Sequence, residues 1–210
     1  MSYLNREGDL RAKKEIPKAK LVFPSQESAR KHLVGRILSP LLDDMGVVFE
    51  FTPSITVVTS ASYQPIDMPH TNYDYHNYNK SSVQDITVDF ELIANTKEEA
   101  DRTLAIIHFF RTFTKMNFGI NDRNRGLPPQ LFRFSAYGDY MFNRVPVAIK
   151  NFSMPLTNDK DYVMTSLNTA VPSHCSFNIG LVFMPTPNKI RSEFSLDGFA
   201  RGDVVKKGYM

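Results

Sequence analysis

The residues best able to carry chemistry lie in a polar, tyrosine-rich stretch over residues 63–82. His70, Asp74 and His76 fall close together there, and imidazole and carboxylate groups are common ligands of zinc. A metal site also needs a rigid frame and further groups that orient the ligands, and this stretch offers no sign of either. We therefore expect a polar surface loop without a metal ion or a bound cofactor.

No catalytic residue is expected from the sequence. It contains no Gly-x-Ser-x-Gly elbow, Walker loop, dinucleotide fingerprint or His-Glu-x-x-His pair. Cys175 is the only cysteine, so an internal disulfide is excluded and assembly inside a cell is favoured. This cysteine falls on the apolar side of an expected strand, where a thiol behaves as a small hydrophobe. The sequence thus favours a protein that is not an enzyme.

The tyrosines of the same stretch could bind another macromolecule. Tyr63, Tyr73, Tyr75 and Tyr78 could stack on nucleic-acid bases, but that role normally comes with a basic groove. Lys80 is the only lysine or arginine in the stretch. Tyrosine also provides contact area in protein interfaces at a modest cost in conformational entropy. We therefore predict an extended hairpin or arm that contacts an adjacent subunit or ring through Tyr73, Tyr75 and Tyr78.

Length and composition limit the class of protein. The chain of 210 residues suits one domain with extensions or at most two small domains, and its hydrophobic content of 42% is enough for a core. No apolar run approaches the ~20 residues that span a bilayer, and the N-terminus lacks the apolar segment of a secretory signal. The net charge of +3 is too small to indicate a dedicated nucleic-acid-binding protein.

The N-terminal residues are expected to lie outside the main domain. Residues 1–20 form a basic arm in which six lysines and arginines face three acidic residues. Two interpretations stay open: a solvated, poorly ordered terminus, or an arm that folds onto a partner during assembly. A short amphipathic helix is expected over residues 25–42, limited by Pro40. We assign this arm and helix to residues 1–45.

The rest of the chain is predicted to be rich in strands. The alternation of apolar and polar residues over residues 86–92 is typical of a half-buried strand. Further strands are expected over residues 47–51, 55–62, 131–136, 141–154 and 174–183, with a last short segment at 193–196. Six or seven mostly antiparallel strands and one dominant helix favour an α+β, mainly β fold, as a β-sandwich or half-barrel with the helix packed on it. The main domain then covers residues 46–197, followed by a tail over 198–210.

The dominant helix is apolar over an unusually wide arc. It is expected to begin at a capping box formed by Thr96 and Glu99 and to end near Gly119. At 100° per residue, its apolar side chains sweep roughly 220°, about twice the stripe of a surface helix. It is either deeply buried in its own domain, or it covers its own sheet and also meets a neighbouring subunit. The candidate contacts of the second interpretation are Phe109, Phe110, Phe113 and Met116.

Four segments between residues 50 and 197 carry a resemblance to a known family. They are SYQPIDMPHTNYDYHNY, the acidic helix start leading to HFFRTFTKMNFG, GLPPQLFRFSAYGDYMFNRVPV, and DKDYV. Together they resemble baseplate tail-tube junction proteins, or tube initiators, of contractile-tailed bacteriophages. The resemblance implies a tail-tube-like antiparallel sandwich with one flanking helix. It also implies that six copies form a ring whose strands close into a barrel around a lumen.

The resemblance further implies what the ring does. It would be a structural virion protein of the tail baseplate, assembled in the host cytoplasm, that joins the central hub to the tail tube and nucleates tube polymerisation. The implied partners are other copies of the chain, the hub protein, and the tail tube protein or a second tube initiator, together with sheath-initiator or wedge proteins. Genomic DNA would pass through the lumen without specific binding, and no membrane is involved.

Two alternative functions stay open. The chain could be the tail tube protein itself or another tube-fold ring such as a terminator, which copy number would distinguish. It could instead be a nucleic-acid-binding module that uses the tyrosine-rich stretch and the basic arm. Binding of short DNA that weakens strongly with salt would support that class of function.

Overall fold

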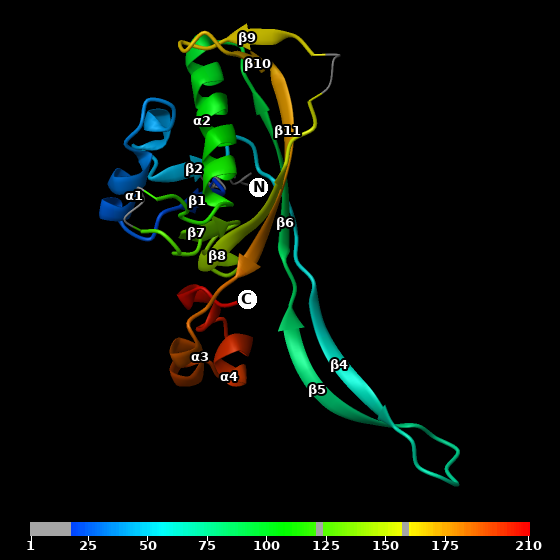
Figure 1. Cartoon of the computed structure of the whole chain (residues 1–210). Helices are drawn as coiled ribbons and strands as arrows, with labels where there is room; N and C mark the ends of the chain where they lie inside the picture. The colour runs from blue at the N-terminus through cyan, green and yellow to red at the C-terminus, as the bar shows by residue number, and fades with distance from the viewer. Residues whose placement is uncertain (1–17, 121–123, 157–159) are drawn as a thin grey trace, which may run out of the picture.

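A computed structural model describes residues 18–120, 124–156 and 160–210 of the chain (Figure 1). Its main element is a seven-stranded antiparallel sheet with the strand order β2-β1-β7-β8-β11-β6-β3. These strands are β1 (Lys20–Val22), β2 (Gly46–Val48), β3 (Ser54–Thr56), β6 (Ile86–Ile93), β7 (Leu131–Ala136), β8 (Phe142–Ser153) and β11 (His174–Phe183). The α+β, mainly β fold class expected from the sequence is confirmed. Of the basic arm, all but the last three residues lie outside the described residues.

The sheet curls because its two edge strands are joined by a very short link. β2 and β3 lie at opposite ends of the strand order, yet only residues 49–53 separate them along the chain. A chain spans at most about 3.6 Å per residue, so the two edges come within about 20 Å of each other. The Phe49 ring packs on the Phe90 ring of β6 at 4.8 Å between centroids. The edges themselves do not pair among the described residues, so the curled sheet stays open in the subunit.

Buried and exposed side chains alternate along the strands, and the buried ones form the core on the concave side of the curled sheet. In β6, Ile86, Val88, Phe90 and Leu92 are buried, whereas Asp89 and Glu91 are exposed. This is the half-buried strand predicted from the sequence. Cys175 of β11 pairs with Leu92 and is also buried, on the apolar side as expected.

The long helix α2 (Lys97–Phe113) lies inside the curve of the sheet (Figure 1). The predicted capping box is confirmed: the Thr96 hydroxyl accepts a hydrogen bond from the backbone N–H of Glu99, and the Glu99 carboxylate accepts one from the N–H of Thr96. A two-stranded sheet of β9 (Tyr162–Met164) and β10 (Ala170–Pro172) lies beside the start of the helix. The helix ends at Phe113, earlier than expected, so Met116 lies in the loop that follows.

One apolar side of α2 packs on the central strands. The Phe110 ring lies 5.9 Å from Phe90 of β6 and 5.2 Å from Phe152 of β8, measured between ring centroids. Phe152 in turn stacks on Phe177 of β11 at 5.8 Å. This aromatic layer joins three neighbouring strands to the helix.

The other apolar side of α2 packs on the opposite part of the same sheet. Phe109 and Phe113 lie 5.2 and 5.3 Å from Phe132 of β7. They lie 6.1 and 5.4 Å from Phe23, which follows β1. Phe109 and Phe110 are 0% exposed and Phe113 is 6% exposed. The structure therefore matches the first interpretation of this helix, burial in its own domain, because a curled sheet covers both of its apolar sides.

The N-terminal residues complete this cover. β1 pairs with both β2 and β7, and helix α1 (Gln26–Leu33) buries Ala29 and Leu33 in the same core. The short 3-10 helix η1 (Ser39–Leu41) packs against α2. Residues 20–45 thus share one hydrophobic core with the rest of the sheet. The boundary expected at residue 45 does not divide this core.

The C-terminal residues are helical where a strand and a tail were expected. They form α3 (Pro187–Glu193), α4 (Leu196–Ala200) and the 3-10 helix η2 (Val205–Lys207). The local reason is capping: Thr186 is followed by a proline in the first turn of α3, and the Ser195 hydroxyl accepts from the N–H of Gly198 at 3.0 Å. Val204 and Tyr209 are buried, so this segment is folded onto the body.

Candidate functional site

Among the described residues, a hairpin formed by β4 (Thr59–Ile66) and β5 (Tyr75–Val83) is the longest exposed stretch. These strands continue β3 and β6 beyond the main sheet and project away from the body (Figure 1). Every residue of β4 is exposed, and so is every residue of β5 except Val83, which is half-buried. Eight residues at about 3.3 Å each give an arm of about 26 Å. The predicted extended hairpin is confirmed, and its contact with another subunit stays a prediction.

The hairpin has two different faces. On one face, Tyr63 and Tyr78 are register partners with their rings 5.8 Å apart in an edge-to-face arrangement. On the other face, Ser60 and Ser82 are partners, with their hydroxyl oxygens 2.9 Å apart. An isolated two-stranded hairpin is at best marginally stable in water, and aromatic pairs gain most when they are buried. The tyrosine face is therefore suited to packing against another polypeptide.

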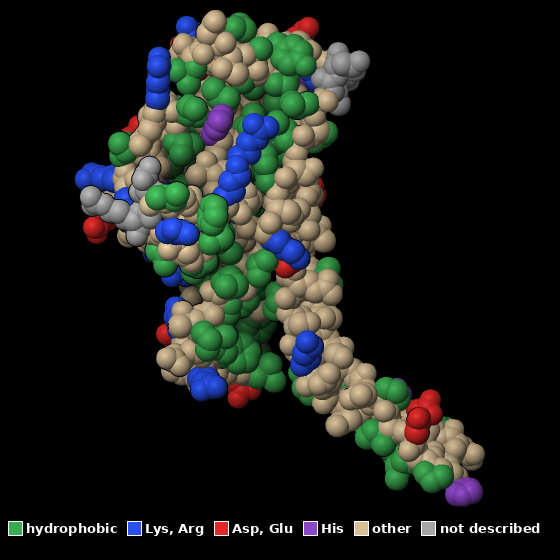
Figure 2. Space-filling view, viewed as in Figure 1, with side chains coloured by type: hydrophobic (Ala, Val, Ile, Leu, Met, Phe, Trp, Pro, Cys, Tyr) green, Lys and Arg blue, Asp and Glu red, His purple; other side chains and the backbone are tan. Residues whose placement is uncertain are grey.

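The hairpin tip, residues 66–75, contains hydrogen bonds between a side chain and its own backbone. The Thr71 hydroxyl lies within hydrogen-bonding distance of the carbonyl oxygens of Met68 (3.3 Å) and Tyr73 (3.2 Å). Tyr73 is 83% exposed, one of the most exposed large side chains among the described residues. Figure 2 shows hydrophobic side chains gathered around this end of the arm beside acidic ones. The tip thus presents apolar and negatively charged groups together.

A groove of about 820 Å³ separates the base of the hairpin from α3 and α4. One wall consists of small side chains of β4 and β5, among them Ala61 and Val83. The other wall is apolar and includes Phe194, which is 45% exposed, and Leu196, which is 76% exposed. Sequence reasoning missed this wall because it treated residues 193–196 as a strand. The signal that could have found it is the pair of helix starts at Thr186 and Ser195.

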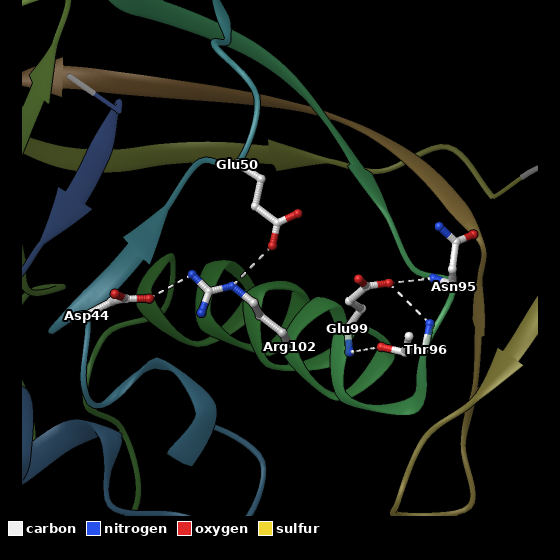
Figure 3. A network of polar contacts seen from close by, with 6 residues as sticks. All are labelled: Asp44, Glu50, Asn95, Thr96, Glu99 and Arg102. Carbon is white, nitrogen blue, oxygen red and sulfur yellow. Dashed lines mark hydrogen bonds and ion pairs between the residues drawn. The ribbon is translucent and has the colours of Figure 1, made fainter. Parts of the chain in front are cut away.

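A polar network holds α2 against the link between the two sheet edges (Figure 3). Arg102 of α2 donates to Asp44 at 2.7 Å, and its Nε lies 3.6 Å from a carboxylate oxygen of Glu50. Asp44 precedes β2 and Glu50 lies in the link that leads to β3. All three side chains are partly exposed, so the pairing contributes modestly to stability. Its role is to fix the position of the link from which β3 and the hairpin emerge.

The remaining candidate interface residue is Met116. It lies beyond the end of α2 and is 48% exposed, next to Phe118, which is 79% exposed. Met116 is thus available to a partner, whereas Phe109, Phe110 and Phe113 are not. The exposed tyrosines of the hairpin and this loop are the sequence-predicted contact residues that the structure leaves at the surface.

The residues considered for chemistry lie on the hairpin and in the core. It places His70 and Asp74 in the hairpin tip and His76 in β5, and no group of three or more histidine, cysteine, aspartate or glutamate side chains among the described residues could hold a metal ion. Cys175 is buried, and burial raises the pKa of its thiol. A raised pKa disfavours the thiolate, which is the nucleophilic form.

No protein-family model matches the chain, and no curated protein matches it. Among the described residues, no helix is long and apolar enough to cross a membrane. The exposed hairpin and the groove at its base are the surface features of the described residues that a partner could contact.

Proposed function

We propose that this protein is a structural, non-enzymatic component of a contractile phage tail, which forms a hexameric ring between the baseplate hub and the tail tube. The observation that carries the proposal is the β4–β5 hairpin, an exposed arm with a tyrosine pair on one face that continues one edge of the open sheet. The same residues belong to the segments that resemble tube initiators. The proposed place of the protein is the virion baseplate, after assembly in the host cytoplasm.

The physical basis of ring formation is the open edge of the sheet. Unpaired strand edges expose N–H and C=O groups that can pair with another chain. β3 and the two hairpin strands carry such edges among the described residues. If neighbouring subunits pair through these strands, the six half-barrels become one closed barrel without free edges. The tail-tube-like fold and the barrel thus belong to the proposed assembly.

The proposed mechanism is geometric nucleation. A ring that has already formed presents six copies of one surface with the spacing of the tube, so the first ring of tube protein does not have to assemble unaided. The proposed partners are other copies of this chain, the hub protein, the tail tube protein or a second tube initiator, and sheath-initiator or wedge proteins. DNA would pass through the lumen without specific binding, which agrees with the single lysine on the hairpin strands.

The test is tube assembly from purified proteins. The chain is added in small molar amounts to the tail tube protein of the same phage, and the lag before polymerisation is measured by light scattering. We expect a shorter lag, and electron microscopy should show one ring of the chain at one end of each tube. Incorporation along the whole tube would instead assign the chain to the tube protein itself, and an unchanged lag would contradict nucleation.

A further inference from the structure

The hairpin tip has the properties of a ligand that fits a defined kind of surface. Asp67 and Asp74 are its charged residues, and residues 66–75 contain no lysine or arginine. Between them lie Met68 and Tyr73, which are 54% and 83% exposed. A surface that receives this tip should therefore be hollow, partly apolar and positively charged.

A pocket with these properties lies on the body of the same chain. It encloses about 460 Å³ between the start of β7, the end of β11 and the C-terminal helices. Its apolar wall includes Pro128, Pro129 and Leu131, and its charged residues are Arg133, Lys189 and Lys207. No aspartate or glutamate is among the described residues that line it. We call this hollow the basic pocket.

The positive charge of the basic pocket is only partly compensated within the subunit. Lys189 lies 3.9 Å from the carboxylate of Glu193, at the outer limit of an ion pair, and its own side chain is 44% exposed. Arg133 donates to the backbone carbonyl of Arg144 at 3.4 Å, a neutral acceptor. Most of the charge therefore stays available to an incoming carboxylate.

The tip cannot fill the basic pocket of its own subunit. The hairpin carries the tip about 26 Å beyond the sheet, and it points away from α3 and α4 (Figure 1; Figure 2). The pocket lies on the side of the body where β7 and α3 meet. A tip that occupies this pocket must therefore come from another molecule. A second copy of the same chain suffices, because its acidic tip is complementary in charge to the basic pocket.

We propose that the hairpin tip of one copy docks into the basic pocket of the next copy around the ring. This rests on the proposed ring and names the two surfaces that meet in it. Because the two surfaces differ, the contact is head-to-tail, and repeating it generates a closed ring when the rotation between copies allows closure. Tyr73 fills the apolar part of the pocket, while Asp67 and Asp74 face the cations at its rim.

The test uses charge reversal in the full-length chain. One variant carries Asp67→Lys and Asp74→Lys, and a second carries Lys189→Glu and Lys207→Glu. Each should form rings at least about tenfold less well than the wild type, because like charges meet at every contact. A matched control carries Lys31→Glu and Lys97→Glu, which change the net charge as much as the second variant on residues that do not line the pocket. Ring formation is measured by sedimentation, and thermal unfolding checks that each monomer is folded.

An equal mixture of the two variants provides the decisive measurement. In a ring where the variants alternate, every contact joins charges of opposite sign, so ring formation should recover to near the wild-type level. Loss in each variant with recovery in the mixture supports the proposal. Wild-type assembly by both variants, or no recovery in the mixture, overturns it. Neither outcome decides the proposed function, which fails separately if the wild-type chain does not shorten the lag of tube assembly.

Discussion

The helix α2 and the β4–β5 hairpin both carry more apolar surface than a simple surface element needs, yet the structure treats them in opposite ways. The phenylalanines of α2 are buried by their own subunit, whereas the tyrosines of the hairpin are exposed. The difference lies in what the chain places around each element. A curled sheet and the N-terminal segment enclose α2 on both sides, but no described element packs along the hairpin. Excess apolar surface indicates a partner only when the rest of the fold cannot cover it.

The largest effects should come from α2. Phe109→Ala and Phe110→Ala each remove a fully buried ring and leave a cavity, so each should lower the free energy of unfolding of the monomer by about 3–5 kcal/mol. Chemical denaturation followed by circular dichroism measures the loss. Met116→Ala is the control, and it should change stability by less than about 0.5 kcal/mol because its side chain is half exposed. If Phe109→Ala weakened assembly and spared the monomer, α2 would be an interface helix after all.

A smaller effect is expected where α2 meets the link between the sheet edges. Arg102→Met removes the pairing with Asp44 and Glu50 but keeps most of the side-chain volume. Because these groups are partly exposed, the loss of monomer stability should be about 1 kcal/mol or less. Raising the salt concentration should reduce the difference in monomer stability between the variant and the wild type, because salt screens the ion pair. A loss as large as that of Phe109→Ala would show that this network is needed to hold the two edges of the curled sheet in place.

The packing of His32 of α1 should also make the stability of the monomer depend on pH. His32 stacks on Phe23 at 5.7 Å, and burial, with a contribution from Lys31, lowers its pKa. The folded state therefore favours the neutral ring. The stabilisation is complete above the unfolded pKa of about 6.5, and it is lost as the pH falls towards the lower folded pKa. Melting temperatures between pH 5 and 8 should show this loss in the wild type, and His32→Leu should reduce it. An identical pH dependence in both proteins would rule out His32 as its source.

The smallest effect on the monomer is expected in the hairpin. Replacing Tyr63 and Tyr78 by serine removes an exposed cross-strand pair, which contributes at most about 1 kcal/mol. The body of the subunit should melt almost unchanged, while ring formation should fall at least about tenfold because interface aromatics often carry most of the binding energy. Ser60→Ala with Ser82→Ala, on the opposite face, is the matched control. Equal loss of assembly in both variants would mean that the hairpin's shape, and not its aromatic face, makes the contact.

Local signals predicted a large part of the fold. The alternation in β6 and the capping box of α2 depend on residues a few positions apart, and both are confirmed. The exposed arm was also predictable, since tyrosine-rich residues 63–82 are too polar for a core element. Its strand register, which includes an irregularity between Ser62 and Tyr63, was not.

The wrapping of α2 could not be predicted in the same way. It depends on pairings such as Leu21 with Phe134, which are far apart in the sequence. No local pattern reports how far a sheet curls, so the apolar arc of the helix was compatible with burial and with an interface. The basic pocket has the same origin, because β7 and the C-terminal helices meet only in the folded chain.

The position of β11 in the sheet has a consequence for how the protein is made. It pairs with β8 on one side and β6 on the other, so it joins the β2-β1-β7-β8 strands to the β6-β3 strands. Until the chain has been synthesised through Phe183, these blocks have no strand between them. Such non-local pairing slows folding and leaves strand edges exposed to aggregation during synthesis. Because β11 follows the other six strands of the sheet in the sequence, the sheet can be completed only after all of them have been synthesised, which favours ring formation between finished subunits.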